Sequence, residues 1–130
     1  MKALLPPGWP RPKGYSNGIA ASGRFVLTGG VVGWDETEHF LSDTLAGQFE
    51  QVLRNIVAIL REGGAASEHV VRMTCYVTSI EDYLTSLKDI GAAWKSVIGP
   101  HYPTMALVEV VRIVEREAKV EIEATAVVPE

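Results

Sequence analysis

Two stretches of the chain carry apolar residues at the three- and four-residue spacing of an amphipathic helix. The first begins at a Ser42-Asp43 N-cap and ends at Gly63-Gly64, and its stripe consists of Leu45, Phe49, Val52, Leu53, Ile56, Ile59 and Leu60. The second follows Ser79 and ends at Gly99-Pro100, and its stripe consists of Tyr83, Leu87, Ile90, Trp94, Val97 and Ile98. The spacing predicts two helices, each with one face in a hydrophobic core.

Around these helices, apolar and polar residues alternate with period two, as they do in half-buried strands. This pattern predicts strands over residues 70–78, 104–113 and 118–128. Nearer the N-terminus, residues 19–21 and 24–28 flank Ser22-Gly23, which is typical of a hairpin. The predicted order is ββαβαββ, an α+β fold with two helices on one face of a mostly antiparallel sheet.

The predicted strand 104–113 is largely apolar on both sides. One side carries Met105, Leu107, Glu109 and Val111, and the other carries Ala106, Val108, Val110 and Arg112. A strand of this kind is buried on both faces, whereas two helices cover only one face of the sheet. The pattern therefore predicts that a second copy of the chain covers the other face.

Composition places the 130 residues in a single domain, with 47% apolar and 22% charged residues. Residues 1–14 are rich in proline and predict an extended arm. The net charge of −4 does not favour nucleic-acid binding, which depends mainly on Lys and Arg. A single cysteine, Cys75, excludes an intrachain disulfide, and the sequence shows no signal peptide or membrane span, so a cytoplasmic location is expected.

Several motifs in order resemble one family. They are Tyr15-Ser16, Phe25-Val26-Leu27-Thr28-Gly29-Gly30, Gln51-x-x-x-Asn55, Val71-Arg72-Met73-Thr74-Cys75-Tyr76-Val77, Pro103-x-x-x-x-Val108-Glu109-Val110 and Val120-Glu121-Ile122-Glu123-Ala124. Over residues 14–128 the set is similar to the RidA (YjgF/YER057c/UK114) family of reactive-intermediate deaminases. The resemblance implies a chorismate-mutase-like fold, a homotrimer and a ligand cleft at each subunit interface.

The resemblance also implies hydrolysis of enamines and imines, such as 2-aminoacrylate, to a 2-oxo acid and ammonia without a cofactor. Because 2-aminomuconate deaminases belong to the family, a catabolic aminated intermediate is one expected substrate. Two alternatives remain. One is a non-catalytic trimer that binds a small metabolite or shields a partner protein. The other, which the acidic composition disfavours, is an endoribonuclease, an activity described for some members.

The family's site residues are only partly present in this chain. Its tyrosine before the first strand matches Tyr15, its Ser-Gly pair becomes Thr28-Gly29, and its glutamate in the last strand matches Glu121. The arginine that grips the substrate carboxylate is replaced by Met105, and the cysteine two residues later is replaced by Leu107. Substrate binding is therefore expected at Tyr15, Thr28, Gly29, Met105 and Leu107.

Loss of the arginine removes a charge-assisted pair worth about 2–5 kcal/mol, so small 2-imino acids are expected to be poor substrates. Arg72, Lys119 and His101 are possible replacement cations. Met105, Leu107 and Trp34 either make the pocket apolar, to suit a larger or aromatic ligand, or seal the trimer interface.

Imine hydrolysis needs a water delivered to carbon and a proton delivered to the departing amine, and a partly desolvated carboxylate can serve both needs. Glu121 is the catalytic candidate, with Thr28 and the Gly29 backbone orienting ligand or water. Alternatively, Glu109, Glu121 and Glu123 pair with Arg72, Arg112 or Lys119 across strands. Cys75 is expected in the core, and the three histidines lack the spacing of a metal site.

Overall fold

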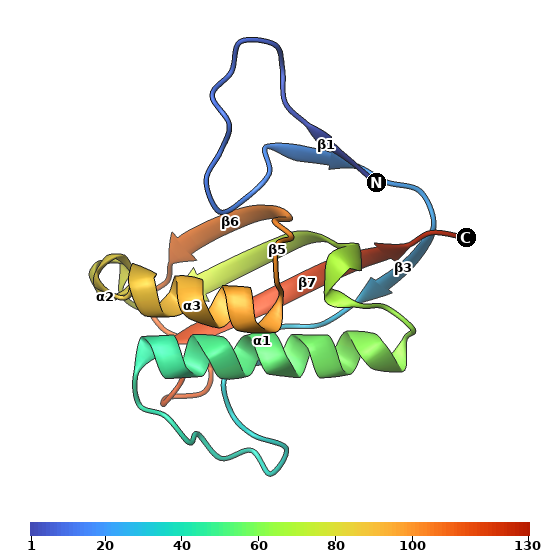
Figure 1. Ribbon diagram of the computed structural model, residues 1–130. Coiled ribbons are helices and arrows are strands. Elements are labelled where there is room, and N and C mark those ends of the chain that lie inside the picture. The colour runs from blue at the N-terminus through green and yellow to red at the C-terminus, as the bar shows by residue number, and fades with distance from the viewer.

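The computed structural model describes all 130 residues and confirms an α+β fold (Figure 1). Its helices are α1 (Leu45–Glu62), α2 (Ile80–Thr85) and α3 (Leu87–Val97), with a short 3-10 turn at Ser67–His69. Its strands are β1 (Lys2–Leu4), β2 (Gly18–Ala20), β3 (Arg24–Leu27), β4 (Val31–Val32), β5 (Val70–Val77), β6 (Thr104–Glu109) and β7 (Val120–Val128). The main sheet has the order β3-β7-β5-β6, and β4 also pairs with β7.

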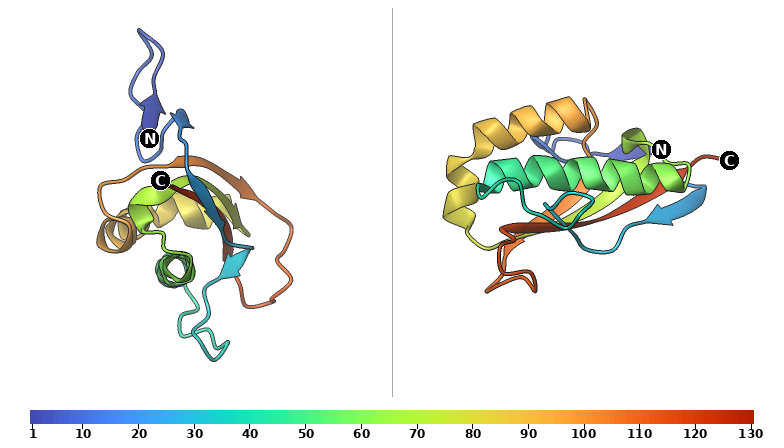
Figure 2. Two further views of the ribbon diagram at one scale, coloured as in Figure 1. Left: turned by 90° about the vertical axis from the view of Figure 1, so that its right-hand side faces the viewer. Right: turned by 90° about the horizontal axis from the view of Figure 1, so that it is seen from below.

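The helices lie together on one face of the main sheet, and no helix lies on the other face (Figure 2). The core between these two layers contains the stripe of α1 and the inward-facing residues of the two central strands. The strand residues are Val70, Met73, Cys75 and Val77 from β5, and Val120, Ile122, Ala124 and Ala126 from β7. The predicted burial of Cys75 is therefore confirmed.

The sheet is mixed but mostly antiparallel. β5 pairs antiparallel with β7 and parallel with β6, with Met73 opposite Met105 and Cys75 opposite Leu107. A parallel neighbour requires a crossover connection, which α2 and α3 supply. The strand predicted over 104–113 ends at Glu109, and the last strand begins at Val120.

The hairpin predicted around Ser22-Gly23 is wrong. β2 pairs with β1 in a separate two-stranded sheet, and β3 pairs with β7. A Cβ on Gly23 would lie 2.1 Å from the carbonyl oxygen of Val128, so the chain passes directly against the end of β7 at this point. β3 then continues along the longest strand of the sheet instead of turning back on β2.

The second predicted helix is interrupted. The Ser79 hydroxyl accepts a hydrogen bond from the Asp82 N–H (3.1 Å), as expected for an N-cap, but Ser86 has φ −106° and ψ 7° and separates α2 from α3. The first helix is capped one residue later than expected, at Thr44, whose hydroxyl accepts the hydrogen bond from the Gly47 N–H.

Polar residues on α1 tie the helix to the loops around it. The amide of Asn55 donates to the carbonyl oxygens of Val32 (3.1 Å) and Trp34 (2.7 Å) and accepts a hydrogen bond from Gln51. Gln48 is buried, donates to the carbonyl oxygens of Ser42 and Glu117, and accepts from the Lys119 N–H at 2.7 Å. These side chains fix α1 against β4 and against the start of β7.

The face of the sheet opposite the helices carries exposed apolar side chains at its two edges. Phe25 and Leu27 of β3 are 64% and 61% exposed, and Val108 of β6 is 44% exposed. Thr74, Tyr76, Glu121 and Glu123 lie on the central strands between these edges. None of the helices is long and apolar enough to cross a membrane.

Candidate functional site

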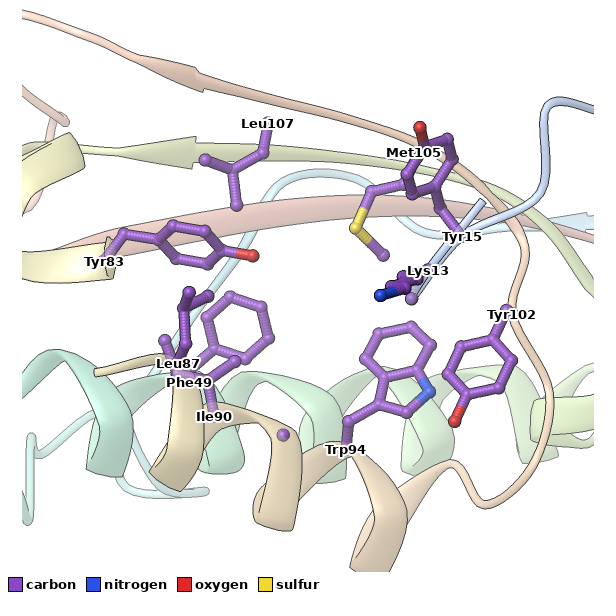
Figure 3. Close-up of a pocket in the computed structure, with 12 residues that line it drawn as sticks. Lys13, Tyr15, Phe49, Tyr83, Leu87, Ile90, Trp94, Tyr102, Met105 and Leu107 are labelled. Atoms are coloured by element: carbon purple, nitrogen blue, oxygen red, sulfur yellow. The ribbon is translucent and has the colours of Figure 1, made fainter. Parts of the chain in front are cut away.

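A cavity of about 530 Å³ lies where α3 meets β6 (Figure 3). Twelve residues line it: Lys13, Gly14, Tyr15, Phe49, Tyr83, Leu87, Ile90, Gly91, Trp94, Tyr102, Met105 and Leu107. Nine of the twelve are hydrophobic, and the volume lies within the range of sites for small organic ligands. Three of the predicted substrate-binding residues, Tyr15, Met105 and Leu107, are among them.

The arm reaches this cavity because Ser16 is bound to the chain just before β6. The Ser16 N–H donates to the carbonyl oxygen of Pro103 (3.0 Å), its hydroxyl donates to that of Tyr102, and Ser16 forms a parallel bridge with Thr104. Gly14 precedes this anchor with φ +82°, a conformation that favours glycine. Lys13 and Tyr15 are thereby held beside the first residues of β6.

Aromatic rings form much of the wall. Trp94 and Tyr102 stack with ring centroids 6.3 Å apart and an angle of 8° between their planes. The Trp94 indole N–H donates to the carbonyl oxygen of His101 (3.1 Å), which fixes the indole. Tyr83 packs against Phe49 with centroids 6.5 Å apart, and burial, followed by the nearby Cys75, raises the pKa of its hydroxyl.

Lys13 is the only charged residue among those that line the cavity, and the cations expected to replace the family arginine lie elsewhere. Arg72 alternates with Met73 on β5 and so lies on the opposite face of the sheet. Lys119 precedes β7, on the edge of a separate polar groove. The His101 ring bonds the carbonyl oxygen of Val70 (2.6 Å).

The other predicted site residues form a second group around β7, which β5 separates from β6 and Met105. The Thr28 hydroxyl donates to the carbonyl oxygen of Gly29 (2.8 Å) and accepts from the Ala124 N–H (3.1 Å). A Cβ on Gly30 would lie 2.5 Å from Oε2 of Glu121, so the carboxylate packs directly on backbone at this point. A Cβ on Gly29 would meet no other atom within 4 Å, so the backbone there is open to a ligand or water. Thr28, Gly29 and Glu121 are thus neighbours, but they do not line the Met105 cavity.

The cross-strand ion pairs considered for the glutamates are not formed. The structure has one salt bridge, between Arg54 and Glu50 on α1. Glu123 accepts a hydrogen bond from the Tyr76 hydroxyl (2.9 Å), which raises the pKa of that hydroxyl, and Glu109 accepts the Ile80 N–H at the start of α2. Glu121 is half-buried on β7, opposite Tyr76 and Val32, without a cationic partner.

Two further residues singled out in the sequence lie outside the cavity. Trp34 packs against Phe40, with ring centroids 5.8 Å apart. Cys75 is buried under α1, and burial raises the pKa of its thiol to about 12. Since the thiolate is the nucleophilic form, Cys75 is unsuited to nucleophilic chemistry.

Sequence reasoning missed Lys13, Tyr83, Leu87 and Trp94 as cavity residues. Three of them belong to the apolar stripe of the second predicted helix, where they were assigned to the core. For Lys13 the sequence does contain a signal. In an extended arm, side chains two residues apart lie on the same side, and Lys13 is two residues before Tyr15.

The architecture is that of a small α+β domain with a ligand-sized cavity at the edge of its sheet. A family model described as Endoribonuclease L-PSP matches residues 10–128. A RutC family protein of Synechocystis is 31% identical over 99% of this chain and 98% of its own length. The 2-iminobutanoate/2-iminopropanoate deaminase of Salmonella typhimurium is 29% identical over 81% of this chain and 80% of its own length.

Solved structures agree with these matches. The Rid family protein YyfB of Yersinia pestis superimposes with a TM-score of 0.83 at 28% identity, over 98% of each chain. The YjgF gene product of E. coli superimposes with a TM-score of 0.68 at 26% identity, also over 98% of each chain. The chain therefore belongs to the RidA/YjgF family.

Proposed function

We propose that this protein hydrolyses an enamine or imine to a carbonyl compound and ammonia without a cofactor, with a substrate preference different from that for small 2-imino acids. Family membership and the name of the Salmonella relative support the reaction class. The observation that carries the proposal is the Glu121 carboxylate, half-buried, without a salt bridge, and packed on Gly30 beside Thr28. The replacement of the family arginine by Met105 supports the altered preference.

In the proposed reaction, Glu121 takes a proton from a water molecule as the water oxygen attacks the imine carbon. The proton passes to the imine nitrogen, which gives a tetrahedral carbinolamine. Collapse of this intermediate forms the C=O bond, breaks the C–N bond and releases ammonia, so imine plus water gives carbonyl compound plus ammonia. An enamine enters the same sequence after protonation at carbon. Thr28 and the open backbone at Gly29 orient the water or the substrate.

The complete site is proposed to form between subunits of a homotrimer. Within one chain, Tyr15, Met105 and Leu107 line the helix-side cavity, whereas Thr28, Gly29 and Glu121 lie outside it, around β7. In a trimer the contact is heterologous, so contact of the β6 edge of one chain with the exposed face of the next would place the Met105 group against the partner's Glu121 group.

The test of catalysis is ammonia release from a panel of imines generated in situ by an amino-acid oxidase. Glu121→Gln removes the base with little change in volume and is expected to lower kcat by about 10²–10⁴-fold. Glu123→Gln is the matched control, because it lies two residues along the same face of β7, and it should retain activity. Full activity of Glu121→Gln would refute the assignment.

A non-catalytic metabolite-binding subunit is the second candidate function. Met105 and Leu107 favour it, because they stand where the family's arginine and cysteine are expected and neither offers a charge or a nucleophile. Ligand binding without ammonia release from any imine of the panel would support this candidate over the deaminase. Ribonuclease activity, named in the description of the family model, stands third, because the chain has a net charge of −4.

A further inference from the structure

The cavity beside β6 combines a single positive charge with aromatic walls. Lys13 is the only charged residue among the 12 that line the cavity, and none of them is acidic. Lys13 is exposed and takes part in no salt bridge, so its ammonium group is free to meet a ligand. In Figure 3 its nitrogen is drawn between Met105 and Trp94. An anion that enters this cavity therefore meets Lys13 and no competing carboxylate.

The walls of the cavity are suited to a flat apolar group. Trp94 and Tyr102 present two nearly parallel rings, and Leu87, Met105 and Leu107 are aliphatic or thioether side chains around the same space. Aromatic ligands gain from stacked or edge-on contacts with such rings in addition to the burial of their area. A volume of about 530 Å³ is also much larger than a three- or four-carbon imino acid needs.

We propose that Lys13 supplies the anion-binding charge of this protein, and that its ligand is an aromatic carboxylate whose ring lies against Trp94 and Tyr102. This inference rests on the proposed function to the extent that the substrate is then an aromatic 2-imino acid or its enamine. The charge has moved from the strand position now held by Met105 to the arm, three residues before the Ser16 anchor. A lysine on the arm binds a carboxylate as a point charge and not as a bidentate fork, which leaves room on β6 for apolar contacts.

The test measures binding by isothermal titration calorimetry, with indole-3-acetate as the probe. Indole-3-acetamide, which lacks the charge, and 2-oxobutanoate, which lacks the ring, are the comparison ligands. Indole-3-acetate is expected to bind at least about tenfold more tightly than either, since a hydrogen bond to a charged group is stronger than a neutral one. Its affinity should fall as salt is added, whereas that of the acetamide should not.

Lys13→Gln is expected to weaken indole-3-acetate binding about tenfold, to remove its salt dependence, and to leave indole-3-acetamide unaffected. Arg11→Gln is the matched control, since it removes the same charge from the same arm but from a residue that does not line the cavity. Equal affinity of Lys13→Gln and the parent protein would overturn the proposal. So would an equal loss in both variants, or binding of the acetamide as tight as that of the acid.

These binding measurements are independent of turnover. If indole-3-acetate binds in a Lys13-dependent manner but no imine is hydrolysed, the deaminase proposal fails and the ligand assignment stands. If imines are hydrolysed while Lys13→Gln leaves both binding and the KM for aromatic imines unchanged, the ligand assignment fails and the deaminase proposal stands.

Discussion

At the scale of single residues, Met105 has the largest consequence for function. Its side chain faces the helix layer and lines the cavity together with Leu107 and Tyr15. A thioether contributes apolar contact and offers no donor for a carboxylate. Met105 extends the apolar wall, and we therefore expect it to lower the affinity for small charged ligands.

Met105→Arg tests this interpretation directly. The guanidinium would supply a bidentate grip on a carboxylate, worth about 2–5 kcal/mol, so kcat/KM for 2-iminopropanoate is expected to rise by at least about tenfold. Coupled ammonia release is the measurement. Leu107→Arg places the same charge two residues along the same side of β6 and should give a smaller gain. Hydrolysis by Met105→Arg no faster than by the parent would contradict this account of specificity.

At the scale of secondary-structure elements, α1 depends on one buried polar side chain. Gln48 uses its amide nitrogen for two carbonyl oxygens, those of Ser42 and Glu117, and its amide oxygen for the Lys119 N–H. It thereby joins the start of α1 to the segment before β7, from which Glu121 projects. Removal of the amide would leave these partly buried backbone groups without their protein partner.

Gln48→Leu is expected to lower the free energy of unfolding by about 1–3 kcal/mol, because three partly buried hydrogen bonds are lost at once. Urea denaturation followed by circular dichroism measures the change. Gln51→Leu on the same helix removes one bond, to Asn55, and should cost about 1 kcal/mol or less. Equal stability of Gln48→Leu and the parent protein would show that the amide network contributes nothing.

The elements with a strong internal period were predictable from the sequence. The apolar stripe of α1 and the alternation of apolar and polar residues in β5 and β7 are properties of residues close together in the sequence. The bounds of these elements lie within a residue or two of the predicted ones. The partner of β3 was not predictable, because a Ser-Gly turn signal describes local geometry and carries no information about the end of β7, about 100 residues away. The break at Ser86 was also hidden, since the apolar period continues across it.

The site was predictable only in part, for the same reason. Tyr15, Met105 and Leu107 were identified and do share a cavity. Lys13 was missed because the proline-rich arm has no regular pattern of apolar and polar residues, so the sequence does not indicate where the arm runs. Its placement follows from the contact of Ser16 with Pro103, which only the folded chain reveals.

At the scale of the whole molecule, the face of the sheet opposite the helices is the surface through which we expect the protein to associate. Phe25 and Leu27 lie on it with most of their surface exposed. Apolar side chains gathered on a strand surface of this kind mark an interaction site more often than an inert surface. The homotrimer remains a prediction.

Sedimentation velocity at micromolar concentration is expected to give the mass of three subunits. Leu27→Asp should shift the protein toward the monomer, because a charge would be buried without a partner in the interface. Leu84→Asp is the control, since Leu84 is similarly exposed, at 57% against 61%, but lies on α2 in the helix layer. A parent protein that sediments as one subunit would contradict the prediction.

The arm gives the molecule two regions of very different local stability. β1 is exposed at all three of its residues and pairs only with β2, whereas β5 and β7 form the centre of the sheet and are largely buried. Segments with few buried contacts open far more often than the core, at a fraction of the global unfolding free energy. Because Ser16 binds the chain just before β6, fraying of β1 from β2 would leave Lys13 beside the cavity. The first residues of the chain can therefore open without loss of the cavity and without unfolding of the domain.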